Sequence, residues 1–139
     1  MTNDTPNLIE WNESYYIGVP RFDQEHVELM GMANAIIQSI HSGGSQSEVE
    51  AAFATLLART CRHFDDEEAV MADTFYSHLA QHRSNHNELI RALVKFAAEA
   101  RSGEVRAQRA GEFLLDWLLE HVLQADVYYA KHFMERGIR

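Results

Sequence analysis

Four long runs of apolar residues, spaced three and four positions apart, constrain most strongly how this chain can fold. The first run begins after Pro20 and ends near Gly43, and the others span 47–72, 77–101 and 105–135. Such spacing puts the apolar side chains on one face of an α-helix, and that face has to be buried. Only two prolines and seven glycines occur in 139 residues, so little interrupts the helices. The sequence therefore predicts an all-α fold.

The predicted helices are joined by short links, such as the SGGS segment at 42–45. Short links favour antiparallel neighbours, and four such helices pack most simply as an antiparallel up-down-up-down four-helix bundle. We expect residues 21–139 to form this bundle as a single domain, with Asp23 as the N-cap of its first helix. Residues 1–20 have no helical periodicity, and we expect an extended N-terminal arm whose aromatic residues pack on the bundle.

Composition and charge argue against several classes of function. The residues are 46% hydrophobic and 24% charged, which is typical of a globular protein. The formal net charge of −9 argues against nucleic acids and anionic membranes as partners, since both require basic patches. No run is apolar for long enough to cross a bilayer, and the N-terminus lacks the features of a signal peptide. Together with a single cysteine, Cys61, this favours a cytoplasmic protein.

Several polar side chains fall on helix faces that should be apolar. Residues four positions apart on a helix point nearly the same way, so His63 and Glu67 share one inward face, as do His82 and His86. All four predicted helices contribute such residues: His26, His63, Glu67, His82, His86, His121 and Asp126. One buried histidine, or one such pair, would more often be an ordinary core or surface feature. Because all four helices contribute, the pattern favours one shared site.

A shared metal site would compensate for burying these groups. An isolated buried carboxylate or an unpaired imidazole is costly, and a cation offsets that cost directly. Seven ligands are too many for one tetrahedral zinc ion, but they suit two octahedral ions that share bridging carboxylates. Nitrogen and oxygen ligands without thiolate favour iron or manganese, with cobalt or zinc as replacements in vitro.

Four separated motifs resemble the hemerythrin family, specifically its single-domain bacterial members, the bacteriohemerythrins. In chain order they are WNESYYIGVPRFDQEH from Trp11, HFDDEEAVM from His63, YSHLAQHRSNH from Tyr76 and HVLQAD from His121. The resemblance covers nearly the whole chain and fills all seven ligand positions of the family pattern. One departure is Ser77, which follows Tyr76 where the family often has proline. We expect it to affect only the start of the third helix.

The resemblance implies a cofactor of two iron ions (Fe2+/Fe3+) bridged by an oxo or hydroxo group. It assigns His82, His86 and His121 to one iron, His26 and His63 to the other, and Glu67 and Asp126 to both as bridges. The iron with two histidines would keep an open position for dioxygen. The implied function is reversible dioxygen binding at a non-haem di-iron centre, for storage, delivery or sensing.

Two parts of this site need further interpretation. His121 and Asp126 are five residues apart and diverge by roughly 140° on a regular helix. Either the helix widens locally or Asp126 reaches sideways between the irons. A dry pocket would also favour reversible binding, and its candidate walls are Leu29, Trp117 and Leu123. The alternative for these three residues is ordinary core packing.

Residues outside the motifs are expected to have structural roles. His41, His78 and His132 should lie at the surface or cap helices, and Glu68 should be solvated. Tyr128 is a candidate neighbour of the metal ligands, with simple burial as the alternative.

The alternative function is a di-iron enzyme with peroxidase-like or nitric-oxide-handling activity. Carboxylate-rich di-iron enzymes carry Glu-x-x-His pairs on their helices, and this chain has none. The sequence therefore favours a binding protein over an enzyme. The expected partners are dioxygen, with nitric oxide or small anions at the open iron position, and neither nucleic acid nor membrane. We expect a monomer.

Overall fold

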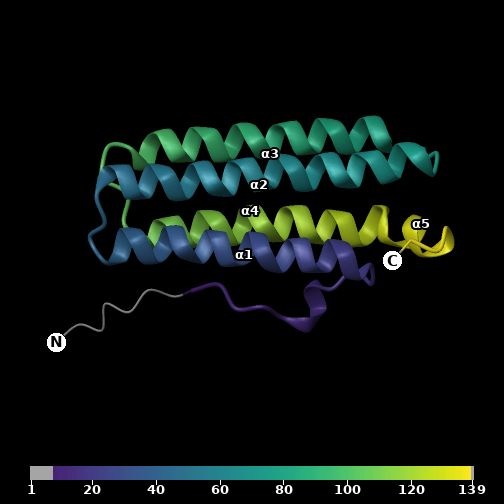
Figure 1. Ribbon diagram of the computed structural model, residues 1–139, viewed down its shortest axis with the longest axis horizontal. Coiled ribbons are helices and arrows are strands. Elements are labelled where there is room, and N and C mark those ends of the chain that lie inside the picture. Colours follow the sequence, from purple (N-terminus) through teal and green to yellow (C-terminus); the bar gives the residue numbers. More distant parts are fainter. Residues whose placement is uncertain (1–7, 139) are drawn as a thin grey trace.

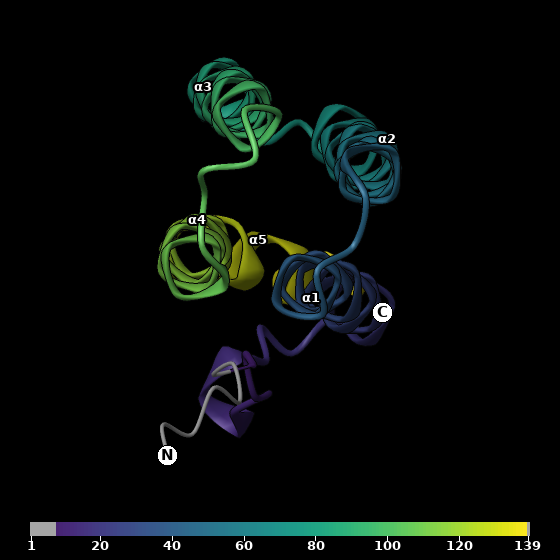
Figure 2. The ribbon, with the colours of Figure 1, turned by 90° about the vertical axis from the view of Figure 1, so that its left-hand side faces the viewer.

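A computed structural model describes residues 8–138, without the side chains of residues 122–128. It contains four long helices: α1 (Pro20–His41), α2 (Gln46–Asp73), α3 (Leu79–Ala100) and α4 (Ala107–Tyr128). They run side by side in alternating directions, and a view along their axes places them at the corners of a square (Figures 1 and 2). The predicted antiparallel four-helix bundle is confirmed. No helix among the described residues is long and apolar enough to span a membrane.

The turn between α1 and α2 follows the sequence prediction closely. Gly43 adopts a positive φ of 75°, a conformation that costs glycine little because it has no Cβ. The Gly44 amide donates to the Ser39 carbonyl at 2.8 Å, which closes the end of α1. The Ser45 side chain then accepts a hydrogen bond from the Glu48 amide and starts α2.

The predicted N-cap role of Asp23 is wrong. Helix α1 begins at Pro20, with Val19 as its N-cap, so Asp23 lies inside the first turn. Its carboxylate is buried and accepts hydrogen bonds from the amides of Ile17 (2.7 Å) and Gly18 (3.2 Å). Asp23 therefore fastens the arm to the bundle, because proline already occupies the first position of the helix.

The described part of the N-terminal arm lies along the α1 and α4 side of the bundle (Figure 2). It contains a short 3-10 helix, η1 (Glu13–Tyr15), and is held by the side chain of Asn34. That amide group bonds both the N–H and the carbonyl of Ile9 at 2.8 Å. Trp11 and Tyr15 pack on the core as expected, but Tyr16 remains half exposed.

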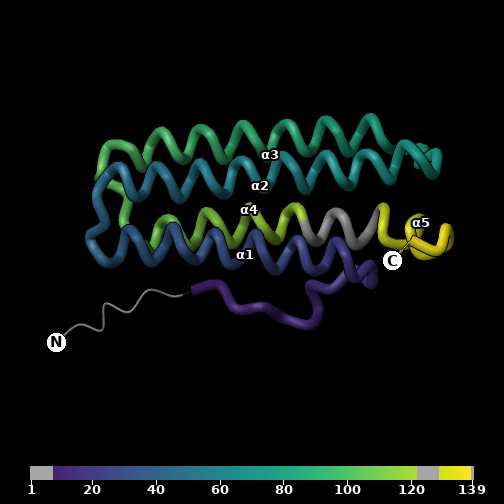
Figure 3. Tube along the Cα trace, in the orientation of Figure 1, coloured from purple at the N-terminus to yellow at the C-terminus, as the bar shows by residue number. Residues whose placement is uncertain are grey.

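The predicted continuous helix over 105–135 is wrong at one position. Helix α4 ends at Tyr128, and a short helix, α5 (Ala130–Glu135), follows after Tyr129 (Figures 1 and 3). The break lets Tyr129 and Phe133 point into the end of the bundle, where both are fully buried. Phe133 packs on Phe22 of α1 with ring centroids 5.4 Å apart. Burial of two large aromatic side chains offsets the lost helical hydrogen bonds.

Two apolar clusters divide the bundle along its length. The larger one includes Leu29, Phe64, Leu89 and Trp117. The smaller one closes the end near α5 and includes Phe22, Met71, Tyr129 and Phe133. The described inward polar residues lie in a layer between these clusters; on α1, His26 follows Phe22 of the smaller cluster by one turn and precedes Leu29 of the larger one by one turn.

Candidate metal centre

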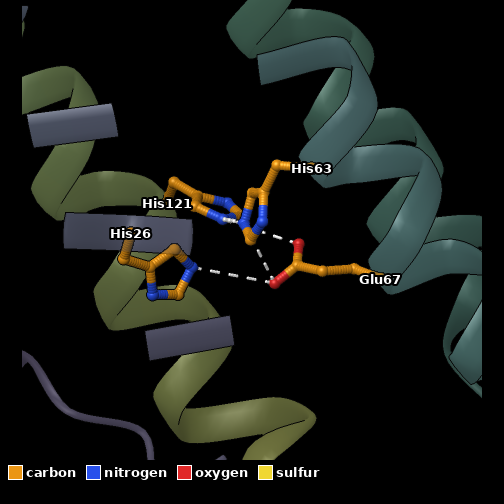
Figure 4. A group of neighbouring side chains, drawn as sticks. All are labelled: His26, His63, Glu67 and His121. Carbon is orange, nitrogen blue, oxygen red and sulfur yellow. Dashed lines mark hydrogen bonds and ion pairs between the residues drawn. The ribbon is translucent and has the colours of Figure 1, made fainter. Parts of the chain in front are cut away.

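Four buried side chains from three helices meet at the centre of the polar layer. His26 of α1, His63 and Glu67 of α2, and His121 of α4 each offer a ligand atom, and these atoms lie within 4.8 Å of one another. Figure 4 shows the three imidazoles pointing at the carboxylate of Glu67. The sequence placed all four on inward helix faces, and the structure brings them together.

The carboxylate of Glu67 is the hub of this cluster, and its two oxygens face different imidazoles. Oε2 lies 3.8 Å from His26 Nε2 and 3.4 Å from His63 Nε2. Oε1 lies 3.5 Å from His121 Nε2 and 3.3 Å from His86 Nε2. Each carboxylate oxygen thus faces two histidines, and the two pairs adjoin, since Nε2 of His63 and Nε2 of His121 lie 3.0 Å apart.

His82 lies at the edge of the cluster and outside the group of four. It is buried on α3, one turn before His86, with ring centroids 5.9 Å apart. Its ring also lies 5.1 Å from that of Tyr129. The side chains of Asp126 and Leu123 lie outside the described residues, as does that of Tyr128.

Two further carboxylates hold the histidines from outside. Glu25 Oε1 lies 2.5 Å from His63 Nδ1, and Glu68 Oε2 lies 2.7 Å from His86 Nδ1. The prediction that Glu68 is solvated is therefore wrong, since its side chain is only 19% exposed. An Nδ1–H that donates to a carboxylate fixes the ring and leaves Nε2 available as an acceptor. The sequence could have indicated both glutamates, because each is next to a predicted ligand: Glu25 precedes His26, and Glu68 follows Glu67.

Tyr129 is a further residue that sequence reasoning missed. Its hydroxyl donates a hydrogen bond to Glu67 Oε2, and its side chain is fully buried. The sequence suggested Tyr128 instead, because the helix was expected to continue unbroken. The turn after α4 brings the next tyrosine to the cluster.

Burial and mutual contact shift the protonation of these groups in the metal-free protein. Burial alone would raise the pKa of Glu67, but the His63 and His121 imidazoles hold this pKa well below its usual range. Burial opposes protonation of His63, yet the carboxylates of Glu67 and Glu25 raise its pKa to about 9. Burial lowers the pKa of His26 and lowers that of His121 strongly. The imidazoles of His26 and His121 are therefore neutral, as metal ligands must be.

Several buried polar atoms have no hydrogen-bond partner among the described residues. They include both ring nitrogens of His26, Nε2 of His86 and Oε1 of Glu67. Buried polar groups without partners are rare, since each costs about 1–3 kcal/mol. Lone pairs that converge in a buried layer fit a metal cation, so the residues present are suited to holding one.

Leu29 and Trp117, the described candidates for a pocket wall, belong to the larger apolar cluster. Leu29 is one turn after His26 on α1, and Trp117 is one turn before His121 on α4. Both are buried, and the Trp117 indole N–H donates to the Leu89 carbonyl at 2.8 Å. This bond holds the indole in one orientation against the polar layer.

The histidines outside the motifs have ordinary surroundings. His41 and His78 are exposed, and His78 precedes the first residue of α3. His132 Nε2 lies 2.7 Å from the hydroxyl of Thr74, the C-cap residue of α2. The prediction of surface or capping roles is confirmed for these three.

Known proteins share this arrangement of sequence and fold. The chain matches the model of the family described as "Hemerythrin HHE cation binding domain" over residues 17–131. It is 27% identical over 129 residues to a myohemerythrin of Riftia pachyptila, covering 93% of this chain and 97% of that protein. It is 26% identical over 124 residues to a bacteriohemerythrin of Methylococcus capsulatus, covering 88% and 94%.

A solved structure of wild-type hemerythrin shares the fold. Its TM-score is 0.76 at 24% identity, over 90% of this chain and 97% of that one. Because the family model spans well over half of the sequence, the chain belongs to the hemerythrin family.

Proposed function

We propose that this chain binds dioxygen reversibly at a non-haem di-iron centre, for storage, delivery or sensing, and that it is not an enzyme. Membership of the hemerythrin family supports the proposal, as does the buried cluster of imidazoles around one carboxylate. The observation that carries it is the division of four histidines between the two oxygens of Glu67. A carboxylate that faces one pair of donors with each oxygen is placed to bridge two cations.

The proposed ligands follow this division. His26 and His63, at Oε2 of Glu67, would hold one iron. His86 and His121, at Oε1, would hold the other together with His82, which lies one turn before His86. Asp126 is proposed as the second bridging carboxylate, alongside an oxo or hydroxo bridge from solvent. An anion suits this role because it neutralises two cations better than an amide would.

The surrounding residues orient and protect the centre. When bound, the iron pair supplies the electrons that dioxygen takes up on binding and returns on release. Glu25 and Glu68 hold the rings of His63 and His86 with Nε2 turned inward. The Tyr129 hydroxyl donates to Glu67 and fixes the plane of its carboxylate. Three of the proposed ligands, His63, His86 and Glu67, are thus held before the metal arrives, which lowers the entropic cost of binding.

We propose that Leu29, Trp117 and Leu123 keep the dioxygen pocket dry. Leu29 and Trp117 are buried one turn from His26 and His121. Water and protons promote loss of reduced oxygen species, so a polar wall residue should shorten the life of the oxygenated form. The substitution Leu29→Asn should therefore speed autoxidation, and so should Leu123→Asn. If a variant autoxidises at the same rate as the unchanged chain, the substituted residue does not line the dioxygen pocket.

The central experiment measures iron content and absorption before and after exposure to air. We expect two iron atoms per chain, a charge-transfer band that appears with dioxygen, and loss of the band when dioxygen is removed. His26→Ala should lower the iron content and abolish the reversible band. His41→Ala on the same helix is the matched control, because His41 is exposed, and it should change neither.

The same preparation discriminates binding from catalysis. Sustained oxidation of an added reductant with dioxygen, hydrogen peroxide or nitric oxide would show a di-iron enzyme and overturn the proposal. Nitric oxide and small anions are proposed as further ligands of the open iron position, detectable as competitors of dioxygen.

We also propose that the chain is a monomer. The exposed large apolar side chains among the described residues belong to different elements and do not share one helix face: Leu8, Tyr16, Val27, Phe75, Val94 and Met134. A stable dimer usually needs a contiguous apolar patch. Light scattering after size-exclusion chromatography should give one chain per particle, and a dimer mass would contradict the proposal.

A further inference from the structure

The four interfaces between neighbouring helices differ in how they shield the histidine cluster. Between α1 and α2, the Arg59 guanidinium lies 2.8 Å from Glu28 and 3.8 Å from Glu25. Between α2 and α3, Arg83 lies 3.2 Å from Glu68. At both interfaces an arginine stands outside the carboxylate that holds a histidine. A positive side chain at these positions repels an approaching cation.

The interface between α1 and α4 is shielded by the chain itself. The described part of the N-terminal arm lies across these two helices (Figure 2). Ile9 is fastened to Asn34 of α1, and the short helix η1 contacts α4. A cation that approached from this side would have to displace the arm.

The remaining interface, between α3 and α4, contains a small cavity that reaches the cluster. Its volume is about 30 Å3. Its lining comprises His82, Asn85, His86, Glu88, Leu89, Glu120 and His121. Since one water needs about 10–15 Å3 of such space, the cavity has room for a cation that keeps a water or two.

The lining changes in character from the surface to the interior. Glu88 and Glu120 are exposed acids on facing helices, and neither lysine nor arginine lines the cavity within the described part of the chain. At the inner end, His86 Nε2 is buried and has no hydrogen-bond partner among the described residues. Its other nitrogen is held by Glu68, so the ring cannot turn away. A charged mouth thus leads to an available nitrogen ligand.

We infer that the α3–α4 cavity is the route by which divalent iron enters the apoprotein, with Glu88 and Glu120 attracting the ion and His86 receiving it. This inference rests on the proposed di-iron centre and adds its loading path. The carboxylates act on the arriving hydrated ion by long-range attraction. They are not ligands in the final site.

The test follows the rate of metal uptake by the apoprotein, with Co2+ as the probe and its absorption bands as the signal. The double variant Glu88→Gln/Glu120→Gln removes two charges at the mouth. At low ionic strength its uptake should be about tenfold slower than that of the unchanged chain, because clefts of one charge speed opposite ions by about 10- to 1000-fold. Near 1 M salt, where the screening length falls to about 3 Å, the two rates should converge.

A matched control removes the same charge elsewhere. Glu104→Gln/Glu112→Gln alters two exposed acids remote from the cavity, and its uptake rate should stay close to that of the unchanged chain. A second variant, Asn85→Phe, fills the cavity without changing charge. Its uptake should be slower at every salt concentration, while far-UV circular dichroism confirms its helical content.

The outcomes separate this inference from the proposed function. Fewer than two Co2+ per unchanged chain at the endpoint would overturn the di-iron centre itself. Two Co2+ per chain, with equal uptake rates for the unchanged chain and the cavity-mouth variant, would overturn only the entry route. Slowing by the control variant to the same extent would also overturn it, because the effect would then come from net charge.

Discussion

The ion pair between His63 and its two carboxylates should make the stability of the apoprotein depend on pH. Glu67 and Glu25 raise the pKa of the His63 ring from 6.5 to about 9 against the effect of burial. A histidine whose pKa is higher in the folded than in the unfolded state adds to the free energy of unfolding. That contribution is complete at a pH below the unfolded-state pKa. That stability is lost as the pH rises through the folded pKa. The relevant window therefore runs from pH 6.5 to about 9.

The size of the effect follows from the shift. At about 1.4 kcal/mol per pKa unit, the shift corresponds to a loss of about 3 kcal/mol of unfolding free energy across this window. The interaction between His63 and Glu67 also holds the pKa of Glu67 low. Because both shifts come from one interaction, its free energy enters this figure only once. A typical domain has only about 5–15 kcal/mol in total, and the loss should be easy to measure.

Glu25→Gln is the perturbation that isolates one carboxylate. Glu25 Oε1 lies 2.5 Å from His63 Nδ1, and the substitution removes its charge but keeps its shape. The pH-dependent loss should shrink by roughly half, because Glu67 still raises the pKa of His63. Glu28→Gln is the matched control: Glu28 lies on the same helix as Glu25 and pairs with Arg59 of α2, and no hydrogen bond or ion pair joins it to His63 among the described residues.

The assay is urea unfolding of metal-free protein, followed by far-UV circular dichroism at several pH values between 6 and 10. The unchanged chain and Glu28→Gln should lose stability in parallel, and Glu25→Gln should lose less. A flat profile for the unchanged chain, or identical profiles for all three proteins, would refute the reasoning. Loading with metal should flatten the profile, because bound imidazoles no longer titrate in this range.

Three further predictions concern the closed end of the bundle and the metal. Tyr129→Phe removes the hydroxyl that donates to Glu67, and should lower apoprotein stability by about 1–3 kcal/mol in urea unfolding; no change would mean that the bond is unimportant. Phe133→Ala empties a fully buried position in α5 and should cost about 3–5 kcal/mol. Phe75→Ala should cost almost nothing, since Phe75 is 84% exposed, and equal losses would contradict the packing argument. Iron loading should raise the melting temperature, and a chelator should reverse the rise, because a ligand that binds only the folded state stabilises it; identical melting curves would exclude a metal coupled to the fold.

The helical period accounts for most of what could be predicted. It placed His26, His63, Glu67 and His121 on inward faces, and the structure brings all four within ligand distance of one another. The period is a local property, set by 3.6 residues per turn. It therefore specifies which residues point inward, whatever the helix packs against. The positive φ of Gly43 at the end of α1 was also predictable, because the preference of glycine for this conformation is a local property too.

The residues that were missed depend on contacts between helices. Glu68 lies off the inward face of α2, and it meets His86 because α3 packs beside α2. Glu25 of α1 likewise contacts His63 because α2 packs beside α1. Tyr129 reaches Glu67 because α4 ends one residue earlier, a break that neither proline nor glycine marks. Each of these contacts spans more than ten residues of chain.

The amino-acid order alone determined four amphipathic helices, their antiparallel packing and a layer of histidines and carboxylates within the core. Periodicity and short links are enough for that, since each acts over a few residues. The tertiary structure decided which carboxylates hold the imidazoles, where the last helix breaks and which helix interface contains a cavity. These features depend on distances between side chains of different helices, and such distances exist only after the bundle has packed.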